Sequence, residues 1–499
     1  MSDSPMMVHE VAILGTGFGG LAMGCRLREQ GVGDFVILEK AAGVGGTWRD
    51  NTYPGAACDV RSHLYWLSFA DRPEWTKSYS DQPEILANIE RLVETSGLAP
   101  HIRFNTEVTD AAWDDTRLLW RINTAAGDTI MARHFVAAWG QLNRPAYGGI
   151  EGRDRFAGPL FHSARWRHDV PLEGKRVACI GVGPSAAQFI PQVARQAGHL
   201  TVFQRSPNYV VPRLDRPYTA DEHRVFRAMP FQRDASRQAI YAEHESWHGA
   251  MRLDSPMAEG FTIMARLQLE SQVADPALRA KLWPDYPIGC KRIVVADDYY
   301  PALARPNVTL ETTGISSVEE TGIRTSDGVL HEFDVIIFGT RFETETQLGV
   351  EDIKGRGGRS LREMWRPVPE AYLGIHVSGF PNFHILYGPN TNLGHNSVLL
   401  MIECQVDYTL RVIAAASQNG VPALDVTPAA MGEFNRQLQE GLAGSSWTGS
   451  CSSWYKHADG RITNNWPGSV EDYKQRTAAF DIAEYELVAT SERVAVALP

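Results

Sequence analysis

The chain has 499 residues, of which 43% are hydrophobic and 21% are charged, and it carries a formal net charge of −11. This composition excludes a disordered, collagen-like or coiled-coil chain and predicts a globular protein of two or three domains. The acidic balance and the lack of a basic run exclude a nucleic-acid footprint and a polybasic membrane anchor, so small molecules are the expected partners.

The N-terminal region shows no basic stretch followed by an apolar segment, and no apolar run approaches the ~18 residues that cross a membrane. We therefore expect a cytoplasmic protein without stable membrane insertion. Its six cysteines are widely separated, and no His/Cys cluster has zinc spacing, so we expect no metal site. The oligomeric state stays open.

The first predicted elements form a dinucleotide-binding unit. A strand over residues 11–14 leads into a glycine turn, and a helix follows over residues 21–30. The turn contains Gly15, Gly17 and Gly20 in the pattern G-x-G-x-x-G. Glycines are needed there because a pyrophosphate lies on exposed backbone N–H groups at the positive end of the helix, where a Cβ would block it.

The same arrangement recurs in the middle of the chain. A strand over residues 176–180 leads into Gly181 and Gly183, followed by Ser185 and Ala186 at the start of a predicted helix. Ala186 replaces the third glycine, which the motif permits. The sequence therefore predicts two nucleotide-binding units and an α/β fold with two Rossmann-like domains.

The two units differ in the charged residue that follows their second strand. The strand over residues 35–38 ends on Glu39, where an acidic residue binds ribose hydroxyls, whereas the strand over residues 200–203 is followed by Arg205. A carboxylate disfavours a 2′-phosphate and an arginine favours it. We therefore predict FAD in the first unit and NADPH in the second, with hydride transfer between them as the natural chemistry.

At this point the sequence resembles the Baeyer–Villiger monooxygenases, the class B flavoprotein monooxygenases that act on ketones. Phe156, Gly158, His162 and Trp166 match the fingerprint F-x-G-x-x-x-H-x-x-x-W. A second fingerprint, G-x-W-x-x-x-x-[FY]-P-G-x-x-x-D, is matched by Gly46, Trp48, Tyr53, Pro54, Gly55 and Asp59. The resemblance covers about residues 8–487.

The resemblance implies an FAD- and NADPH-dependent enzyme that inserts one oxygen atom of dioxygen into a ketone through a flavin peroxide, to give an ester or a lactone. The alternative is a flavin-containing monooxygenase that oxidises sulfur or nitrogen. Such enzymes share both glycine motifs but seldom have Trp166 and Asp59. A redox-sensing or nucleotide-binding protein without catalysis is the third hypothesis.

By the same resemblance, Arg292 is the catalytic cation, Asp59 pairs with it, and Lys291 binds the NADPH phosphate. The chemistry requires a fixed cation because negative charge develops on oxygen. Arginine keeps its proton at any working pH, whereas a lysine in a dry pocket can lose it. An ordinary surface ion pair is the alternative for Arg292 and Asp59.

Four further residues are expected to contact the cofactors. Thr47 and Trp48 lie in the second fingerprint and resemble residues beside the flavin. Asn392 belongs to a glycine-containing loop, residues 388–396, that faces the flavin in the resembling enzymes. Trp454 resembles a residue that contacts the nicotinamide cofactor or the substrate.

Three positions depart from the family pattern. Arg341 stands in place of a glycine after a predicted strand, so we expect a strained backbone or altered NADPH handling there. Trp139 replaces a small residue or threonine and is expected to narrow the nearby site. Ala57 stands where many relatives have arginine, so that contact is not carried over.

These elements predict the domain organisation. Residues 1–147 and 377–499 are assigned to a discontinuous FAD-binding domain, and residues 148–376 to an NADPH-binding domain. Residues 215–285 have helical spacing and are predicted to form a helical insertion in the second domain. Because this insertion leads to Lys291 and Arg292, we expect it to shape an apolar substrate pocket.

Overall fold

The N-terminal strands build a mixed sheet that later parts of the chain complete. The structure is a computed structural model that describes residues 7–343, 348–451, 453–457 and 459–489. The strands of this sheet are β1 (Val8–Leu14), β2 (Phe35–Leu38), β3 (Ile102–Arg103), β4 (Val108–Asp114), β5 (Leu119–Thr124), β6 (Thr129–Ala137), β17 (Asp352–Lys354) and β18 (Phe383–Ile385). Their order is β17-β4-β5-β6-β1-β2-β3, and β18 pairs with β6.

The register of the parallel strands brings three chain segments to one edge of this sheet. β1, β6 and β18 run parallel, and Ala137 is opposite both Leu14 and Ile385. The carboxyl ends of parallel strands are where open α/β sheets bind their ligands. The residues that follow each of these strands, including the first glycine turn, therefore meet at that edge.

Helices cover this sheet and bury its apolar side chains. α1 (Phe18–Glu29) packs against α11 (Val398–Gln418), with Leu21, Ile37 and Val406 in a common core. Other helices belong to the chain segments that precede and follow the second nucleotide-binding unit. They are α2 (Thr47–Asp50), α3 (Gln82–Thr95), α10 (Leu361–Trp365), α12 (Pro428–Leu442) and α13 (Val470–Ala478). β19 (Ala423–Val426) and β20 (Tyr485–Val488) form an antiparallel pair.

A second, fully parallel sheet is built around the second glycine turn. Its strands are β7 (Leu160–His162), β8 (Arg176–Ile180), β9 (His199–Phe203), β12 (Val308–Glu311) and β16 (Val335–Phe338), in the order β12-β9-β8-β16-β7. α4 (Pro184–Gln196) and α9 (Tyr299–Leu303) pack together beside it. A small antiparallel sheet contains β13 (Ile315–Glu319), β14 (Gly322–Thr325) and β15 (Leu330–Glu332). The predicted α/β class with two nucleotide-binding units is confirmed.

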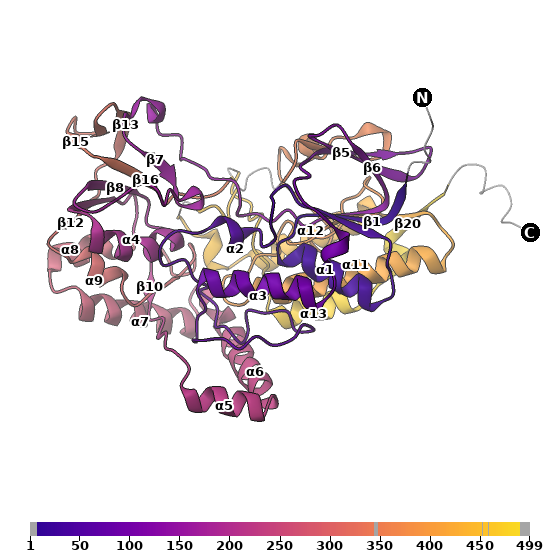
Figure 1. Cartoon of the computed structure of the whole chain (residues 1–499), viewed down its shortest axis with the longest axis horizontal. Coiled ribbons are helices and arrows are strands. Elements are labelled where there is room, and N and C mark those ends of the chain that lie inside the picture. Colours follow the sequence, from indigo (N-terminus) through magenta and orange to yellow (C-terminus); the bar gives the residue numbers. More distant parts are fainter. Residues whose placement is uncertain (1–6, 344–347, 452, 458, 490–499) are drawn as a thin grey trace, which may run out of the picture.

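The predicted helical segment contains four α-helices. They are α5 (Ala220–Ala228), α6 (Phe231–Ser246), α7 (Pro256–Gln272) and α8 (Pro276–Leu282), flanked by the short parallel pair β10 (Val210–Val211) and β11 (Val294–Val295). α5 and α6 project from the body of the molecule (Figure 1). On α7, Phe261, Ala265 and Leu269 are buried, whereas Met264 is 40% exposed and does not belong to the core.

The chain returns to the first sheet before residue 377, where we placed the domain boundary. β17 pairs with β4, and Leu348, Ile353 and Leu361 share a core with Trp120. These apolar side chains pack on the first sheet because their nearest apolar partners lie on β4, β5 and β6. The segment that we assigned to the second domain therefore ends with a piece of the first sheet.

Two of the departures from the family pattern have simple structural accounts. Arg341 has no left-handed backbone conformation, so replacing glycine there leaves no φ strain. Its carbonyl accepts a hydrogen bond from the N–H of Ala146. Trp139 is buried in the core with Phe383, beside Gly349, where a Cβ would overlap the indole. Trp139 thus fills a core beside the first glycine turn.

A hydrogen-bonded row of buried histidines lies within the first domain. His384 bonds His134 through one ring nitrogen (3.1 Å) and His376 through the other (2.7 Å), and the Tyr485 hydroxyl lies 2.9 Å from His376 Nδ1. Burial lowers the pKa of His134 and His376 to about 3 and holds the pKa of His384 well below its ordinary value. The folded protein therefore keeps all three rings neutral through the mildly acidic range.

We expect the free energy of unfolding to fall as the pH is lowered from 7.5 to 5. Histidines of the unfolded chain take up protons below about pH 6.5, whereas His134 and His376 stay neutral in the folded state down to about pH 3. The unfolded state thus binds more protons in this window, and each such histidine costs up to ~1.4 kcal/mol of stability per pH unit. Denaturant unfolding at several pH values checks this, and a flat profile between pH 7.5 and 5 would contradict it.

Candidate active site

The first glycine turn connects β1 to the N-terminus of α1. Gly15 has a φ of +101°, and a Cβ there would lie 2.7 Å from the carbonyl oxygen of Ala138. A Cβ at Gly20 would overlap the carbonyl oxygen of Gly15. At Gly17, by contrast, φ is −74° and no atom lies within 4 Å of the Cβ position. Gly15 and Gly20 thus meet the needs of the turn, and Gly17 leaves open space at the positive end of the helix.

Glu39 follows β2 at the same edge of the sheet and is only 4% exposed. Its Oε2 accepts hydrogen bonds from the N–H (3.0 Å) and the hydroxyl (2.6 Å) of Thr16. Its Oε1 accepts from the N–H of Ala41 (2.9 Å) and lies 3.0 Å from Nη1 of Arg49. These donors fix the carboxylate beside the glycine turn, within the unit that carries Gly15 and Gly17.

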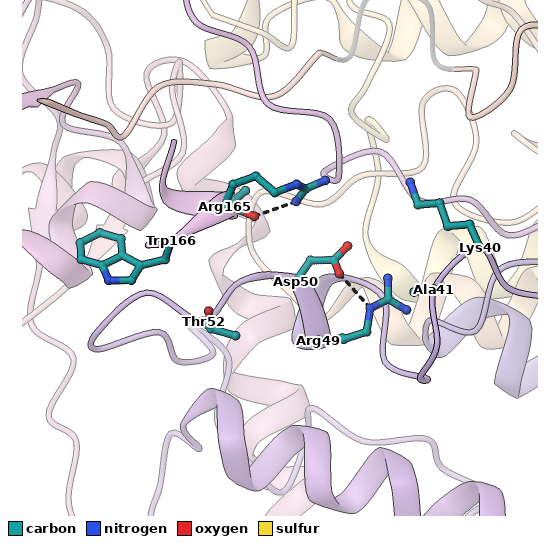
Figure 2. Close-up of a pocket in the computed structure, with 8 residues that line it drawn as sticks. Lys40, Ala41, Arg49, Asp50, Thr52, Arg165 and Trp166 are labelled. Carbon is teal, nitrogen blue, oxygen red and sulfur yellow. Dashed lines mark hydrogen bonds and ion pairs between the residues drawn. The ribbon is translucent and has the colours of Figure 1, made fainter. Parts of the chain in front are cut away.

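A cavity of about 390 Å³ opens next to the residues that follow Glu39. Figure 2 shows Arg49 hydrogen-bonded to Asp50 on one side of it and Arg165 and Trp166, from the first family fingerprint, on another. Three cations, Lys40, Arg49 and Arg165, and one carboxylate, that of Asp50, line the cavity, and this excess of positive charge favours an anionic ligand. Its lining residues are Lys40, Ala41, Arg49, Asp50, Thr52, Ala164, Arg165 and Trp166.

The second fingerprint places Thr47 and Trp48 on α2, close to the first glycine turn. The preceding Gly46 has a positive φ of +53°, and a Cβ there would lie 3.2 Å from the Cα of Gly17. Thr47 is exposed, and the indole N–H of Trp48 donates to the hydroxyl of Tyr65 (3.1 Å). The helix that carries both fingerprint residues therefore begins beside the glycine turn.

The second glycine turn connects β8 to α4 and repeats the geometry of the first. Gly181 has a φ of +105°, and a Cβ there would lie 2.6 Å from the carbonyl oxygen of Gly339. Gly183 precedes α4, and Ser185 lies in the first turn of this helix. The N-terminus of α4 thus offers the same anion-binding end as α1.

Arg205 and Lys291 come together after β9, although 85 residues separate Lys291 from Ser206 along the chain. The Lys291 ammonium donates to the hydroxyl of Ser206 and lies 4.6 Å above the ring of Tyr286. Burial and then the neighbouring Arg205 lower the pKa of Lys291. These two cations and the Ser206 hydroxyl lie together at the end of β9, and such a group of donors is suited to binding a 2′-phosphate.

Arg292 pairs with Asp59 across the two nucleotide units. Its Nε and Nη2 both donate to Oδ2 of Asp59, at 2.8 Å and 2.6 Å, and its Nη1 lies 3.5 Å from the carbonyl oxygen of Leu393. Both side chains are 27% exposed. Burial raises the pKa of Asp59, but Arg292 outweighs it and holds that pKa below its ordinary value. Asp59 in turn raises the pKa of Arg292, so the pair is ionised.

The loop over residues 388–396 lies beside this ion pair and is held by the C-terminal segment. The side chain of Asn392 donates to Oδ1 of Asn465 (2.6 Å) and accepts from the hydroxyl of Tyr387 (2.7 Å). Its N–H donates to the carbonyl oxygen of Asn464, whose side chain donates to the carbonyl oxygen of Trp454 (2.8 Å). The structure thus brings Asn392 and Trp454 into one hydrogen-bonded network next to Arg292.

Several residues of this region escaped the sequence analysis. Arg49 carried no signal because an arginine after a tryptophan has no motif of its own. Cys290 and Cys451 form a disulfide across 161 residues, which wide spacing in the sequence cannot reveal. Tyr387 and Tyr455 interact electrostatically with Arg292, and the sequence analysis named neither of them.

The sequence analysis also considered metal sites and membrane-spanning segments. No group of three or more His, Cys, Asp or Glu side chains in the described ranges is arranged to hold a metal ion. Among the helices that the structure describes, none is both long and apolar enough to cross a membrane.

Comparison with known proteins identifies the family. Residues 13–81 match the model of the NAD(P)-binding Rossmann-like domain. A cyclohexanone monooxygenase from Rhodococcus sp. Phi1, solved with bound NADP+, superposes with a TM-score of 0.87 at 31% identity, over 98% of this chain and 100% of that one. The structure of OTEMO in complex with FAD and NADP has a TM-score of 0.86 at 27% identity, over 96% of this chain and 99% of that one.

A curated relative from Streptomyces coelicolor carries the name Baeyer–Villiger monooxygenase. It is 45% identical over 487 residues, which cover 96% of this chain and 93% of that protein. This identity, over nearly the whole of both chains and with both fingerprints present, means that the protein belongs to the Baeyer–Villiger monooxygenase family.

Proposed function

We propose that the protein uses FAD, NADPH and dioxygen to insert one oxygen atom into a small-molecule ketone, giving an ester or a lactone. The observation that carries this proposal is the Arg292–Asp59 ion pair, which lies where the two nucleotide-binding units meet. A fixed, permanently charged donor at that position suits a reaction in which negative charge develops on oxygen. Family membership supports the same reaction class.

The first unit fits FAD. The open space at Gly17 admits a pyrophosphate, and Glu39 is held beside it as an acceptor for ribose hydroxyls. Gln141 also fits a bound cofactor. Its Nε2 donates to the carbonyl oxygens of Tyr387 and Gly388, but its buried Oε1 has no hydrogen-bond partner among the described residues and is available to a ligand donor. We assign FAD binding to Gly15, Gly17, Gly20, Glu39, Thr47, Trp48 and Asn392.

The second unit fits NADPH. Gly181, Gly183 and Ser185 present the N-terminus of α4 to a pyrophosphate, and Arg205 with Lys291 supplies the charge for a 2′-phosphate. Trp454 is half-buried next to the network of Asn392, where a nicotinamide or a substrate would contact it.

The chain's own residues do the following in this reaction. Bound flavin, once reduced by NADPH, supplies the redox chemistry with dioxygen. Arg292 keeps a permanent positive charge at the site and donates hydrogen bonds to oxygen as it becomes negative. Asp59 takes the Nε and Nη2 hydrogens, which fixes the guanidinium plane and leaves Nη1 on the side of Leu393.

Oxygen consumption and product analysis test this proposal. The purified holoenzyme is given NADPH with cyclohexanone, linear 2-ketones or an aryl ketone, and with thioanisole as a sulfide. We expect ketone-dependent oxygen consumption and an ester or lactone product. Sulfoxide without any ester would favour the heteroatom-oxidising alternative.

We expect NADPH to be much preferred over NADH, and Arg205→Ala to remove most of this preference. Losing one charged hydrogen bond to the 2′-phosphate costs ~1.5–3 kcal/mol, or about one to two decades in affinity. The ratio of kcat/KM for the two cofactors, measured before and after the substitution, checks this. Efficiency with NADH serves as the control and should not change. Equal use of both cofactors by the parent would contradict the assignment.

A further inference from the structure

Tyr455 presents a buried hydroxyl without a hydrogen-bond partner at the centre of the proposed site. The side chain is 1% exposed, and its hydroxyl makes no hydrogen bond of ordinary geometry among the residues that the structure describes, although Arg292 and Asn392 lie near enough to interact with it. An unsatisfied buried hydroxyl is unfavourable, because it loses its bonds to water and gains none. Such an atom marks a place where a ligand supplies the missing partner.

The neighbouring polar groups already have partners. The Asn392 side chain is occupied on both sides, since Tyr387 donates to its oxygen and its nitrogen donates to Asn465. Asp59 takes two hydrogen bonds from Arg292 through Oδ2. Burial raises the pKa of Tyr455, and the Arg292 cation and, to a smaller extent, Asn392 oppose this rise by interacting with the phenol oxygen.

The cation also sets the direction of the hydroxyl. A hydroxyl beside a positive charge turns its lone pairs toward that charge, because its own hydrogen carries a partial positive charge. The hydrogen of Tyr455 therefore points away from Arg292. It is available to an acceptor that approaches the guanidinium from the same side.

Three features hold Tyr455 in this position. The disulfide between Cys451 and Cys290 ties the start of its loop to the residue before Lys291 and Arg292. The Tyr455 carbonyl oxygen accepts from the N–H of Thr463 (3.1 Å), and its ring packs on Trp454 with a centroid distance of 4.6 Å. The loop that carries Tyr455 is therefore fixed to the segment that carries Arg292.

We propose that Tyr455 is a further catalytic residue, whose hydroxyl donates a hydrogen bond to the substrate oxygen that lies against Arg292. This inference rests on the proposed function, since it assumes a carbonyl substrate at that position. Two donors of different charge would then converge on the oxygen that becomes negative, Arg292 through its cation and Tyr455 through a neutral O–H. Tyr455 also distinguishes a carbonyl oxygen, which accepts this bond, from a group without an acceptor.

Tyr455→Phe tests the inference, because it removes the hydroxyl and keeps the ring against Trp454. With cyclohexanone as the probe, we expect ester or lactone formation to fall about tenfold to a hundredfold, while NADPH-driven flavin reduction in stopped flow stays at the parental rate. As a readout without turnover, the affinity of the oxidised enzyme for ε-caprolactone, measured by calorimetry, should fall about fivefold to tenfold. Flavin content should be unchanged if the acceptor belongs to the substrate rather than to a cofactor.

Tyr473→Phe is the matched control, because this buried hydroxyl is fully bonded and lies outside the site. It donates to the carbonyl oxygen of Leu373 (2.6 Å) and accepts from Gln405 (3.1 Å). We expect Tyr473→Phe to lower the Tm of the apoprotein and to leave turnover unchanged. Tyr455→Phe should instead leave the apoprotein Tm equal or higher and impair turnover.

Three outcomes would overturn the inference. The first is that Tyr455→Phe keeps the parental ester yield and the parental affinity for the lactone. The second is a lowered Tm of the Tyr455→Phe apoprotein, which would show that the hydroxyl stabilises the fold. The third is lost flavin or slowed reduction by NADPH, which marks a cofactor contact. Failure of the proposed function looks different, because the parent enzyme itself would then make no ester from any ketone.

Discussion

Arg292→Ala is expected to abolish ester formation while leaving flavin reduction by NADPH close to the parental rate. Removing one preorganised donor costs on the order of 10²–10³ in rate, and a full charge in a water-poor site costs more. Asp59 holds the Arg292 guanidinium at 2.6 Å and raises its pKa, so the cation at this position is fixed and charged. Hydride transfer from NADPH needs no stabilised oxygen anion and therefore continues.

Stopped-flow reduction and ester yield from the same ketone check this prediction on one preparation. Arg195→Ala is a suitable control, since Arg195 forms a surface ion pair with Asp298 and is 53% exposed. Such pairs contribute ~0–1 kcal/mol, so this variant should keep parental activity. Near-parental ester yield in Arg292→Ala would refute its role. Loss of bound flavin would show instead that the Arg292–Asp59 pair is needed to build the site.

Gly17→Ala and Gly20→Ala are expected to fail for different reasons. A Cβ at Gly17 meets no protein atom within 4 Å and the backbone there has an ordinary φ, so the apoprotein should fold normally. The same methyl group occupies the space where a pyrophosphate approaches the end of α1, so FAD affinity should fall by about one to two decades for each charged hydrogen bond lost. At Gly20 a Cβ overlaps the carbonyl oxygen of Gly15, which displaces α1 from β1.

Flavin content after purification, FAD affinity by fluorescence and the Tm of the apoprotein separate these two failures. Gly17→Ala should give a folded, flavin-poor protein with a parental apoprotein Tm. Gly20→Ala should lower that Tm, because overpacking costs ~1–3 kcal/mol or more where backbone must move. A flavin-loaded Gly17→Ala protein would argue against a pyrophosphate at this turn.

The elements that the sequence predicted well are those fixed by short-range patterns. The strands over residues 35–38 and 176–180 occur as β2 and β8, and the helix predicted over residues 21–30 occurs as α1. The sequence analysis did not predict that residues 352–354 join the first sheet, because β17 has only three residues and pairs with a strand that begins at Val108. Such a short strand has no periodicity of its own, so only its partner defines it.

The sequence by itself determined the two nucleotide-binding units, because a glycine turn between a strand and a helix is a local arrangement that a few residues specify. It also identified Arg292 and Asp59 as candidates, but only through resemblance. Their pairing across 233 residues, the approach of Lys291 to Ser206 and the disulfide of Cys290 with Cys451 depend on how distant segments pack. The unpartnered hydroxyl of Tyr455 is of the same kind: a hydroxyl is satisfied or unsatisfied only through its neighbours in space, and only the tertiary structure decides which neighbours those are.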